Sequence, residues 1–392
     1  MKTKILRNTF IIVGVRFVLV RLLFAGTNDG VPNFGNMPLA HPPPAIITFD
    51  APGAGTGPFQ GTVTYAINPM GTIAGYFFDS DSVTHGFVRK PDGTFIAPID
   101  APGGGTGPYQ GTFTASINPA GAITGFVIDS SYVFHGYLRS SHGTFTTFDV
   151  PGAGTGQFQG TTASNINPRG WIAGYWTDAS DVNHGFVRAA GGTITSFDAP
   201  GAGTGPGQGT FTGVNSVYNL NSAGDISGFS IDANNVYHGY LRTLDGTIRV
   251  IDAPGAGTGP YQGTQFSGIN DARTVVGEYI DTNNVNHGFL LAPDGTFTII
   301  DALGAGTGPG QGTLPENINA SGAITGQYVD SNGVNHGFLR TPHGTITAPI
   351  DAPGAGTGPG QGTVPACNNA RNAISGFYVD SNNTWHGFLQ TP

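Results

Sequence analysis

The sequence is poor in cysteine and in charged residues. Cys367 is the one cysteine in 392 residues, so the chain cannot form an internal disulfide. Only 10% of the residues are charged, against about a quarter in typical soluble domains. Beyond residue 26, ten basic residues face 24 acidic ones. This acidic balance argues against nucleic acid and anionic membranes as partners.

Residues suited to catalysis are also scarce. The two glutamates, Glu278 and Glu316, could in principle form the carboxylate pair of a glycoside hydrolase. They fall in different repeats, however, so we expect surface or channel-lining roles and predict no catalytic residue. The glycine-rich segments lack the lysine and the following helix of a phosphate-binding loop, which excludes that kind of site.

The N-terminal region differs from the rest of the chain. Residues 1–26 combine a basic start with two apolar runs, which predicts an export signal. Two arginines interrupt the apolar residues, so we do not expect a stable membrane span, which needs about 20 mostly apolar residues. The alternative is an uncleaved basic tail or a misplaced start codon. Residues 27–44 are proline-rich and predict an extended linker.

Glycine and proline are abundant, with 65 and 28 residues, and they recur at fixed places in a repeat. The segment Asp50–Thr62, Asp-Ala-Pro-Gly-Ala-Gly-Thr-Gly-Pro-Phe-Gln-Gly-Thr, has near-copies at intervals of 49 to 54 residues. A period near 50 predicts a closed array of supersecondary units, because one such unit cannot bury its own apolar face. The seven copies start at Asp50, Asp100, Asp149, Asp198, Asp252, Asp301 and Asp351.

Each repeat reads as four short strands joined by tight turns. In the second complete unit the strands are predicted at Thr112–Asn118, Ala122–Asp129, Tyr132–Arg139 and Gly143–Asp149. The middle strands are apolar on both faces, as expected for sheets that pack between neighbours. Four-stranded antiparallel units repeated around an axis are typical of all-β propellers.

The two ends of the repeat region determine how the ring closes. The region opens with a lone fourth strand, Ile46–Asp50, and ends with a lone third strand, Thr384–Gln390. We therefore predict one domain over residues 45–392, a seven-bladed β-propeller of four-stranded antiparallel blades. The N-terminal strand would pair with the last blade and remove an exposed edge. The alternative is an open β-solenoid, in which both end strands stay unpaired.

The repeat motif resembles that of the bacterial extracellular HAF-repeat proteins. It reads Ile-Asn-Pro-x-Gly-x-Ile-x-Gly in Ile67–Gly75, with His85-Gly86-Phe87 following, and it returns in Ile318–Gly326 with His336-Gly337-Phe338. The family's repeat has a similar Asn-x-x-Gly turn and a His-Ala-Phe core; here glycine replaces the alanine and the glycine-rich connection is longer. The resemblance implies an exported bacterial β-repeat protein, extracellular or at the cell surface. The family has no established activity, so no catalytic residue follows from the resemblance.

A histidine recurs in the third strand of each unit. These strands lie away from the propeller axis, so the seven side chains cannot converge on one metal ion. We expect each to be half-buried and bonded to a loop carbonyl or an aspartate, because buried polar groups need partners. The histidines are His85, His135, His184, His238, His287, His336 and His386.

Two sets of aspartates end the second and the fourth strands, which end on the same face of a meander. We expect each to cap its own turn through nearby backbone amides. The alternative is a surface for Ca²⁺ or a cationic partner; no other cofactor is predicted. The first set is Asp79, Asp129, Asp178, Asp232, Asp281, Asp330 and Asp380, and the second is Asp50, Asp100, Asp149, Asp198, Asp252, Asp301 and Asp351.

Departures from the repeat give the candidate ligand-binding residues. The fourth unit carries about five extra residues within Gly213–Leu220, and loops on a rigid scaffold often carry function. The third unit has aromatic and basic residues suited to stacking on a sugar. Cys367 has no repeated equivalent and is expected to be a small buried side chain. The candidates are Asn215, Tyr218 and Asn219 in the fourth unit and Arg169, Trp171 and Trp176 in the third.

These patterns favour a secreted, monomeric, non-catalytic module that binds or adheres to a glycan or an extracellular protein. One alternative is a purely structural surface or matrix protein, whose repeats need only stack. The other is a propeller hydrolase or lyase acting on polysaccharide, which would require polar residues that converge at the channel mouth. Fold alone does not choose among these.

Overall fold

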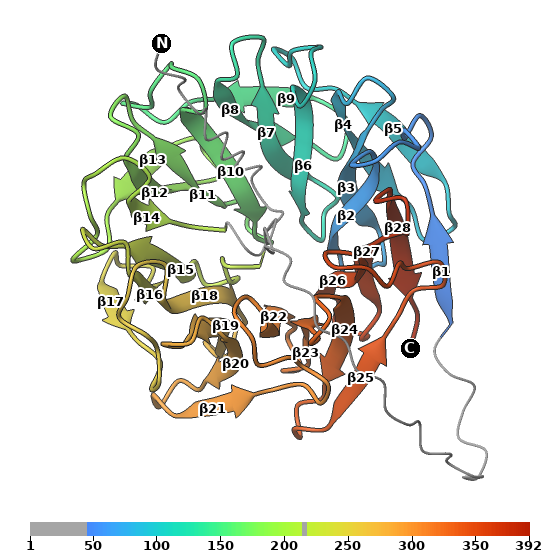
Figure 1. Ribbon diagram of the computed structural model, residues 1–392. Helices are drawn as coiled ribbons and strands as arrows, with labels where there is room; N and C mark the ends of the chain where they lie inside the picture. Colours follow the sequence, from blue (N-terminus) through green and yellow to red (C-terminus); the bar gives the residue numbers. More distant parts are fainter. Residues whose placement is uncertain (1–44, 214–217) are drawn as a thin grey trace, which may run out of the picture.

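The computed structural model describes residues 45–213 and 218–392, and these form a ring of 28 strands without a helix (Figure 1). Seven groups of four strands, which we call blades, surround a central axis. The sequence predicts this all-β, four-strand pattern because turn residues separate short β-branched and aromatic runs. Within the described residues no helix is long and apolar enough to cross a membrane.

The first strand of each blade lies nearest the axis and the fourth lies outermost (Figure 1). The first strands are β2 (Gly61–Ile67), β6 (Gly111–Ile117), β10 (Gly160–Ile166), β14 (Gly209–Phe211), β18 (Gly263–Ile269), β22 (Gly312–Ile318) and β26 (Gly362–Asn368). The second strands are β3 (Ile73–Phe78), β7 (Ile123–Ile128), β11 (Ile172–Thr177), β15 (Ile226–Ile231), β19 (Val275–Ile280), β23 (Ile324–Val329) and β27 (Ile374–Val379).

The outer half of each blade follows the same order. The third strands are β4 (Thr84–Arg89), β8 (Phe134–Arg139), β12 (Asn183–Arg188), β16 (Tyr237–Arg242), β20 (Asn286–Leu291), β24 (Asn335–Arg340) and β28 (Trp385–Gln390). The fourth strands are β5 (Phe95–Ile99), β9 (Phe145–Phe148), β13 (Ile194–Phe197), β17 (Ile248–Ile251), β21 (Phe297–Ile300) and β25 (Ile346–Ile350), with β1 (Ile46–Phe49) in the seventh blade.

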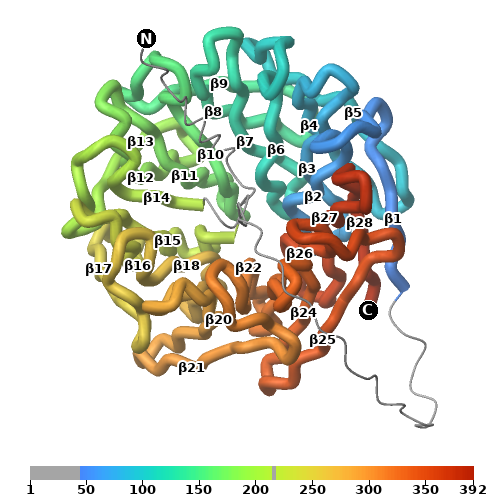
Figure 2. Tube along the Cα trace, viewed as in Figure 1, coloured from blue at the N-terminus to red at the C-terminus, as the bar shows by residue number. Residues whose placement is uncertain are grey.

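The ring closes through the first strand of the chain. β1 pairs antiparallel with β28, in a register that sets Ile46 opposite Gln390 and Phe49 opposite Gly387. Figure 2 shows β1 in blue beside β28 in red. The predicted pairing of the N-terminal strand with the last blade is therefore confirmed. The open solenoid does not hold, because both end strands have partners.

Glycine permits the close contact between successive blades at the start of each first strand. Gly61 has a φ of +110° and forms a parallel bridge with Trp385 of the neighbouring blade. A β-carbon at Gly61 would lie 2.0 Å from the carbonyl oxygen of Trp385. A larger residue is therefore excluded on both steric and conformational grounds. The same parallel bridge recurs between the other blades.

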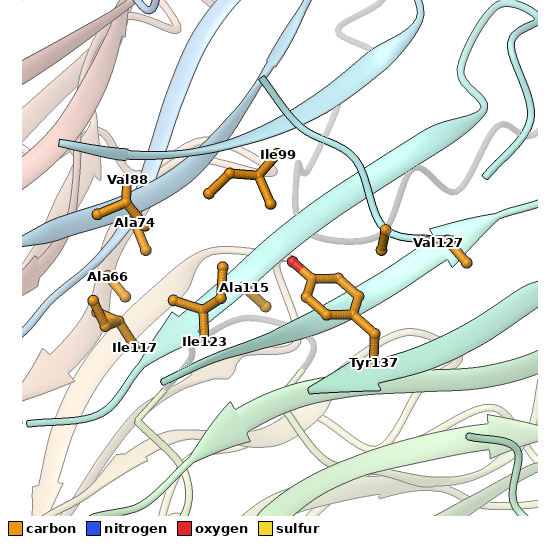
Figure 3. Close-up of a cluster of buried hydrophobic side chains, with 10 residues drawn as sticks. Ala66, Ala74, Val88, Ile99, Ala115, Ile117, Ile123, Val127 and Tyr137 are labelled. Carbon is orange, nitrogen blue, oxygen red and sulfur yellow. The ribbon is translucent and has the colours of Figure 1, made fainter. Parts of the chain in front are cut away.

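The apolar core lies between blades rather than within any one of them. One cluster joins Ala66 and Val88 of the first blade to Ile117, Ile123 and Tyr137 of the second (Figure 3). Each blade thus buries both faces against its neighbours, as the two-sided apolar strands predict. Since apolar burial is the main favourable term in folding, no blade is expected to be stable alone.

Asparagine side chains join the blades where the first strand turns into the second. In each blade this asparagine accepts backbone amide hydrogen bonds from its own turn, as Asn319 does from Ser321 and Ala323. In six of the seven blades its side-chain nitrogen donates to the carbonyl of the equivalent asparagine in the next blade at 2.8–3.4 Å. These donor–acceptor pairs are Asn68–Asn118, Asn167–Asn221, Asn221–Asn270, Asn270–Asn319, Asn319–Asn369 and Asn369–Asn68.

Candidate functional site

The ring has two faces with different turns. The loop face carries the glycine-rich loops between blades and the turns from second to third strands. The turn face, opposite, carries the turns from first to second and from third to fourth strands. Loops on a rigid scaffold commonly carry binding residues.

Each repeated histidine lies on the loop face between two aspartates. The Nδ1 atom of His85 is 2.7 Å from Asp100, and its Nε2 atom is 3.4 Å from Asp79. The other six blades repeat this with distances of 2.8–3.2 Å and 3.7–3.8 Å. The histidine side chains are 20–31% exposed. The prediction of half-buried histidines bonded to aspartate is therefore confirmed.

These aspartates raise the proton affinity of some of the histidines. The hydrogen bond that His85 donates to the carboxylate of Asp100 raises the pKa of His85, and Asp149 and Asp50 do the same for His135 and His386. Hydrogen bonding to the charged form favours that form. In five blades the imidazole also stacks on an aromatic residue of the second strand, at ring-centroid distances of 4.3–5.1 Å. These residues are Phe77, Trp176, Tyr279, Tyr328 and Tyr378.

The aspartates that end the second strands cap their own turns. One carboxylate oxygen of Asp79 accepts the backbone amides of Asp81 and Val83 at 2.9 and 2.8 Å. The same pair of bonds occurs in all seven blades. The turn-capping prediction is confirmed for this set, whereas the aspartates that end the fourth strands bond to the histidines. Among residues 45–213 and 218–392, no group of three or more histidine, cysteine, aspartate or glutamate side chains is placed to hold a metal ion.

Most aspartates lie on the loop face, whereas most lysines and arginines lie on the turn face. The fourteen repeated aspartates, together with Asp81 and Asp181 in the turns, lie on the loop face. Nine of the ten lysines and arginines in the described part of the chain lie at strand ends or in turns of the turn face. These nine are Arg89, Lys90, Arg139, Arg169, Arg188, Arg242, Arg273, Arg340 and Arg371. The loop face therefore presents a negative field to any approaching ligand.

Aromatic residues occupy the tips of four glycine-rich loops. The tip is the residue before the repeated glutamine, and in all seven loops its φ lies between +61° and +79°. A bulky residue in this left-handed region costs roughly 1–2 kcal/mol relative to ordinary backbone. Phe59, Phe158 and Tyr261 are 42%, 47% and 62% exposed. The seven tips are Phe59, Tyr109, Phe158, Gly207, Tyr261, Gly310 and Gly360.

Each tip is fixed at a junction between two blades. The backbone amide of Phe158 donates to the carbonyl of Tyr132, in the second-to-third-strand turn of the preceding blade, at 2.8 Å. The other six tips make the same bond at 2.6–2.8 Å. The adjacent Gln159 holds the loop, because its side-chain oxygen accepts the amide of Gly156. The tips are thus rigid anchors, which suits recognition because little entropy is lost on binding.

Sequence reasoning did not find these tips. The available signal was one position, before Gln-Gly-Thr, that alternates between aromatic residues and glycine inside an otherwise repeated loop. Glycine at three copies shows that the loop needs a positive φ there. Aromatic residues at the other four keep the same backbone despite its conformational cost, which points to a role for the ring itself.

Tyr218, among the candidates of the fourth unit, bonds to first strands of two other blades. The Tyr218 hydroxyl donates to the carbonyl of Ile67 at 2.7 Å, and the Tyr218 carbonyl accepts the amide of Ile269. Ile67 and Ile269 end first strands of the first and fifth blades, so Tyr218 ties distant blades together. Burial raises the pKa of Tyr218 well above its usual value. Asn219 is fully buried, with no side-chain partner among the described residues, and Asn215 lies outside them.

The candidates of the third unit are not brought together. Arg169 and Trp171 lie at the turn face, before β11, whereas Trp176 lies near the loop-face end of that strand. Trp171 packs against the apolar cluster that contains Ile226. The Trp176 ring stacks on His184 at 4.3 Å, and its indole nitrogen donates to Ser196 at 2.6 Å.

The two glutamates lie in neighbouring blades, in β19 and β22. Glu278 is 2% exposed and accepts a hydrogen bond from Ser267 at 3.3 Å. Burial raises the pKa of Tyr65, and the negative charge of the nearby Glu316 raises it further. Cys367 is fully buried, as predicted, and burial raises its pKa to about 12.

A cavity of about 20 Å³ lies among first strands of the first three blades, beside Tyr65, Phe113 and Ser164. It has room for about one ordered water molecule and is far smaller than a site for a drug-sized ligand. The exposed loop tips are therefore the stronger candidate for ligand contact.

No family model matches the sequence, and none of the curated proteins matches it either. Among solved structures, the chain is similar to a prolyl endopeptidase (TM-score 0.50, 10% identity, 88% of this chain covered). It spans about half the length of that protein (50%). It is also similar to the BP39L lectin of Burkholderia pseudomallei (TM-score 0.47, 12% identity, 81% of this chain and 94% of the lectin). At such identities the likeness concerns the fold alone.

Proposed function

We propose that the chain is a seven-bladed β-propeller that acts outside a bacterial cell as a non-catalytic module for binding glycans. One observation carries this proposal: four loop tips hold aromatic rings at a positive φ where three equivalent loops have glycine, and three of these rings are exposed while Tyr109 is half-buried. Aromatic rings provide a large contact area with few rotatable bonds. The apolar face of a sugar can pack on such a ring while its hydroxyl groups remain hydrated.

The charge of the loop face narrows the class of glycan. Sixteen aspartates lie there, and the described lysines and arginines lie elsewhere. A polymer rich in uronate or sulfate groups would be repelled by this field. The proposed ligands are therefore neutral or amine-bearing polysaccharides. Export and a bacterial source are part of the proposal and follow from the resemblance to HAF-repeat proteins.

The test is a binding screen of the full chain against neutral, amine-bearing and uronate-rich polysaccharides, with Ca²⁺ and with EDTA. We expect binding to neutral or amine-bearing polymers that is independent of Ca²⁺. Phe158→Gly should weaken it three- to tenfold, because one stacked ring contributes about 0.5–1.5 kcal/mol. This variant should fold, since Gly207, Gly310 and Gly360 occupy the same position in other loops.

A matched control is available on the same face. Leu303 is 92% exposed and stands where other copies of the loop have proline. Leu303→Pro removes an exposed apolar side chain without changing a tip, and it should leave the affinity unchanged. Absence of binding to every polysaccharide would contradict the glycan proposal and favour a protein partner or a purely structural role.

A further inference from the structure

The aromatic tips are unevenly distributed around the ring. Phe59, Tyr109 and Phe158 occupy three consecutive junctions, from the seventh and first blades to the second and third. Gly207 follows, and Tyr261 stands alone before Gly310 and Gly360. One side of the loop face therefore carries a run of three rings, with the half-buried Tyr109 between the exposed Phe59 and Phe158, while the other carries one ring between glycine tips.

Buried rings connect the first two of these tips. Phe59 contacts Trp385 edge-on at 6.5 Å, Trp385 lies 5.3 Å from Phe78, and Phe78 lies 5.9 Å from Tyr109. Trp385 and Phe78 are 2% and 0% exposed. They support the two tips from beneath and limit their motion, so Phe59 and Tyr109 keep a fixed spacing.

A further aromatic residue extends the run to the third tip. The Tyr132 hydroxyl donates to the carbonyl of Pro108, beside Tyr109, at 3.2 Å, and the Tyr132 ring lies 5.8 Å from Phe158. Tyr132 itself has a φ of +63°. The equivalent turn residues of the other blades are small, acidic, amide or glycine residues: Ser82, Asp181, Asn235, Asn284, Gly333 and Asn383. A second aromatic residue at a costly φ thus lies in the same sector.

We propose that Phe59, Tyr109, Tyr132 and Phe158, called the aromatic band, form one extended binding surface for a polysaccharide chain. This inference rests on the proposed function and specifies it. The ligand is a linear segment of several sugars that lies along consecutive junctions, not a single terminal sugar bound independently at each tip. When linked sites are engaged together, the second contact is intramolecular, so affinity rises with ligand length.

The test is isothermal titration of the full chain with β-1,4-linked oligomers of glucose and of N-acetylglucosamine, two to six sugars long, and with their polymers on beads. We expect one oligomer per chain and at least a tenfold rise in affinity from two to six sugars. Several equivalent sites with no dependence on length would overturn the aromatic band and leave the proposed function standing. Failure of these neutral sugars, together with failure of the wider polysaccharide screen, would overturn both.

Matched variants distinguish the band from a generic effect of aromatic residues. Tyr109→Gly removes the central tip of the band, whereas Tyr261→Gly removes the isolated one, and both introduce the residue found in the other loops. We expect Tyr109→Gly to weaken six-sugar binding at least tenfold and to abolish the length dependence, while Tyr261→Gly changes affinity by less than twofold. Equal losses in the two variants would contradict the proposal.

Discussion

The loop face and the turn face come from the same seven repeats, yet their side chains vary in opposite ways. On the turn face, an asparagine follows the first strand in every blade, and in six of the seven blades its side chain donates to the next blade. On the loop face, the tip residue changes between aromatic and glycine while its φ stays nearly constant. A constant side chain indicates a role in closing the ring, and a variable side chain on a constant backbone indicates recognition.

The fourth blade adds a further link on the turn face and keeps the asparagine that bonds to the next blade. Asp225 is fully buried and accepts hydrogen bonds from Arg273 of the next blade and from Asn221. Burial alone would raise the pKa of Asp225, but these hydrogen bonds outweigh it and hold the pKa below its usual range. The blade with the extra residues thus gains another link to its neighbour.

The largest expected effect is on the turn face. Asn319→Ala removes donors to the Asn369 carbonyl at 2.8 Å and to the Asn372 side chain at 2.9 Å. Leaving buried groups unsatisfied should lower the free energy of unfolding by about 2–3 kcal/mol, measured by urea unfolding. Glycan affinity of the folded protein should not change. Ser321→Ala is the control, because it removes a hydroxyl that bonds only within its own turn. A loss of glycan affinity in Asn319→Ala would show that stability and binding are not divided between the two faces.

The next effect concerns the backbone of the loop tips. Gly310→Tyr places a bulky residue at a φ of +77°. This variant should lower the free energy of unfolding by roughly 1–2 kcal/mol. Phe158→Gly should change the free energy of unfolding by less than about 1 kcal/mol, because glycine adopts the positive φ without cost and this gain offsets the lost contacts of the ring. Thermal unfolding of both variants measures the difference. If Gly310→Tyr does not lower the free energy of unfolding, an aromatic tip has no conformational cost, and that cost no longer supports a functional role for the rings.

A smaller effect is expected at the axis. Tyr218→Phe removes one hydroxyl that donates to the Ile67 carbonyl and should cost about 1 kcal/mol of unfolding free energy. Because Tyr218 lies inside the ring, glycan affinity should stay at the wild-type value. The opposite result, unchanged stability with lost affinity, would restore the extra residues of the fourth unit as the binding site.

The smallest effect is a pH dependence confined to the loop face. Asp149 raises the pKa of His135 in the folded chain. The stability that this pair contributes is therefore fully present below the ordinary histidine pKa of about 6.5, and it is lost as the pH rises through the raised pKa of the folded state. The stability difference between wild type and His135→Gln should shrink from pH 6 to 8. It should remain below about 1 kcal/mol, because the pair is partly exposed. The cost of Asn319→Ala should stay constant over the same range.

Periodicity and turn chemistry made most of the fold predictable. The lone strands at the two ends predicted closure, and the need of buried polar groups for partners predicted that each histidine would bond to a loop carbonyl or an aspartate. The aromatic tips were missed because Gly-Pro-Phe-Gln does not reveal a positive φ at Phe59 until its glycine counterparts are compared. The hydrogen bond between Tyr218 and Ile67 could not be predicted, because the two residues are 151 positions apart and local sequence does not encode so distant a contact.

The closure of the ring also determines the order in which the molecule can be completed. Asp50 follows the first strand and meets His386 of the last blade, 336 residues later. At synthesis rates of 5–20 residues per second, β1 waits roughly 20–70 s for β28 to emerge. During that time it is an unpaired edge, and its four residues with a following Asp-Ala-Pro-Gly turn limit pairing with other chains. β1 precedes its partner β28 by more than six blades' worth of sequence, so the ring closes only after the last blade has been made.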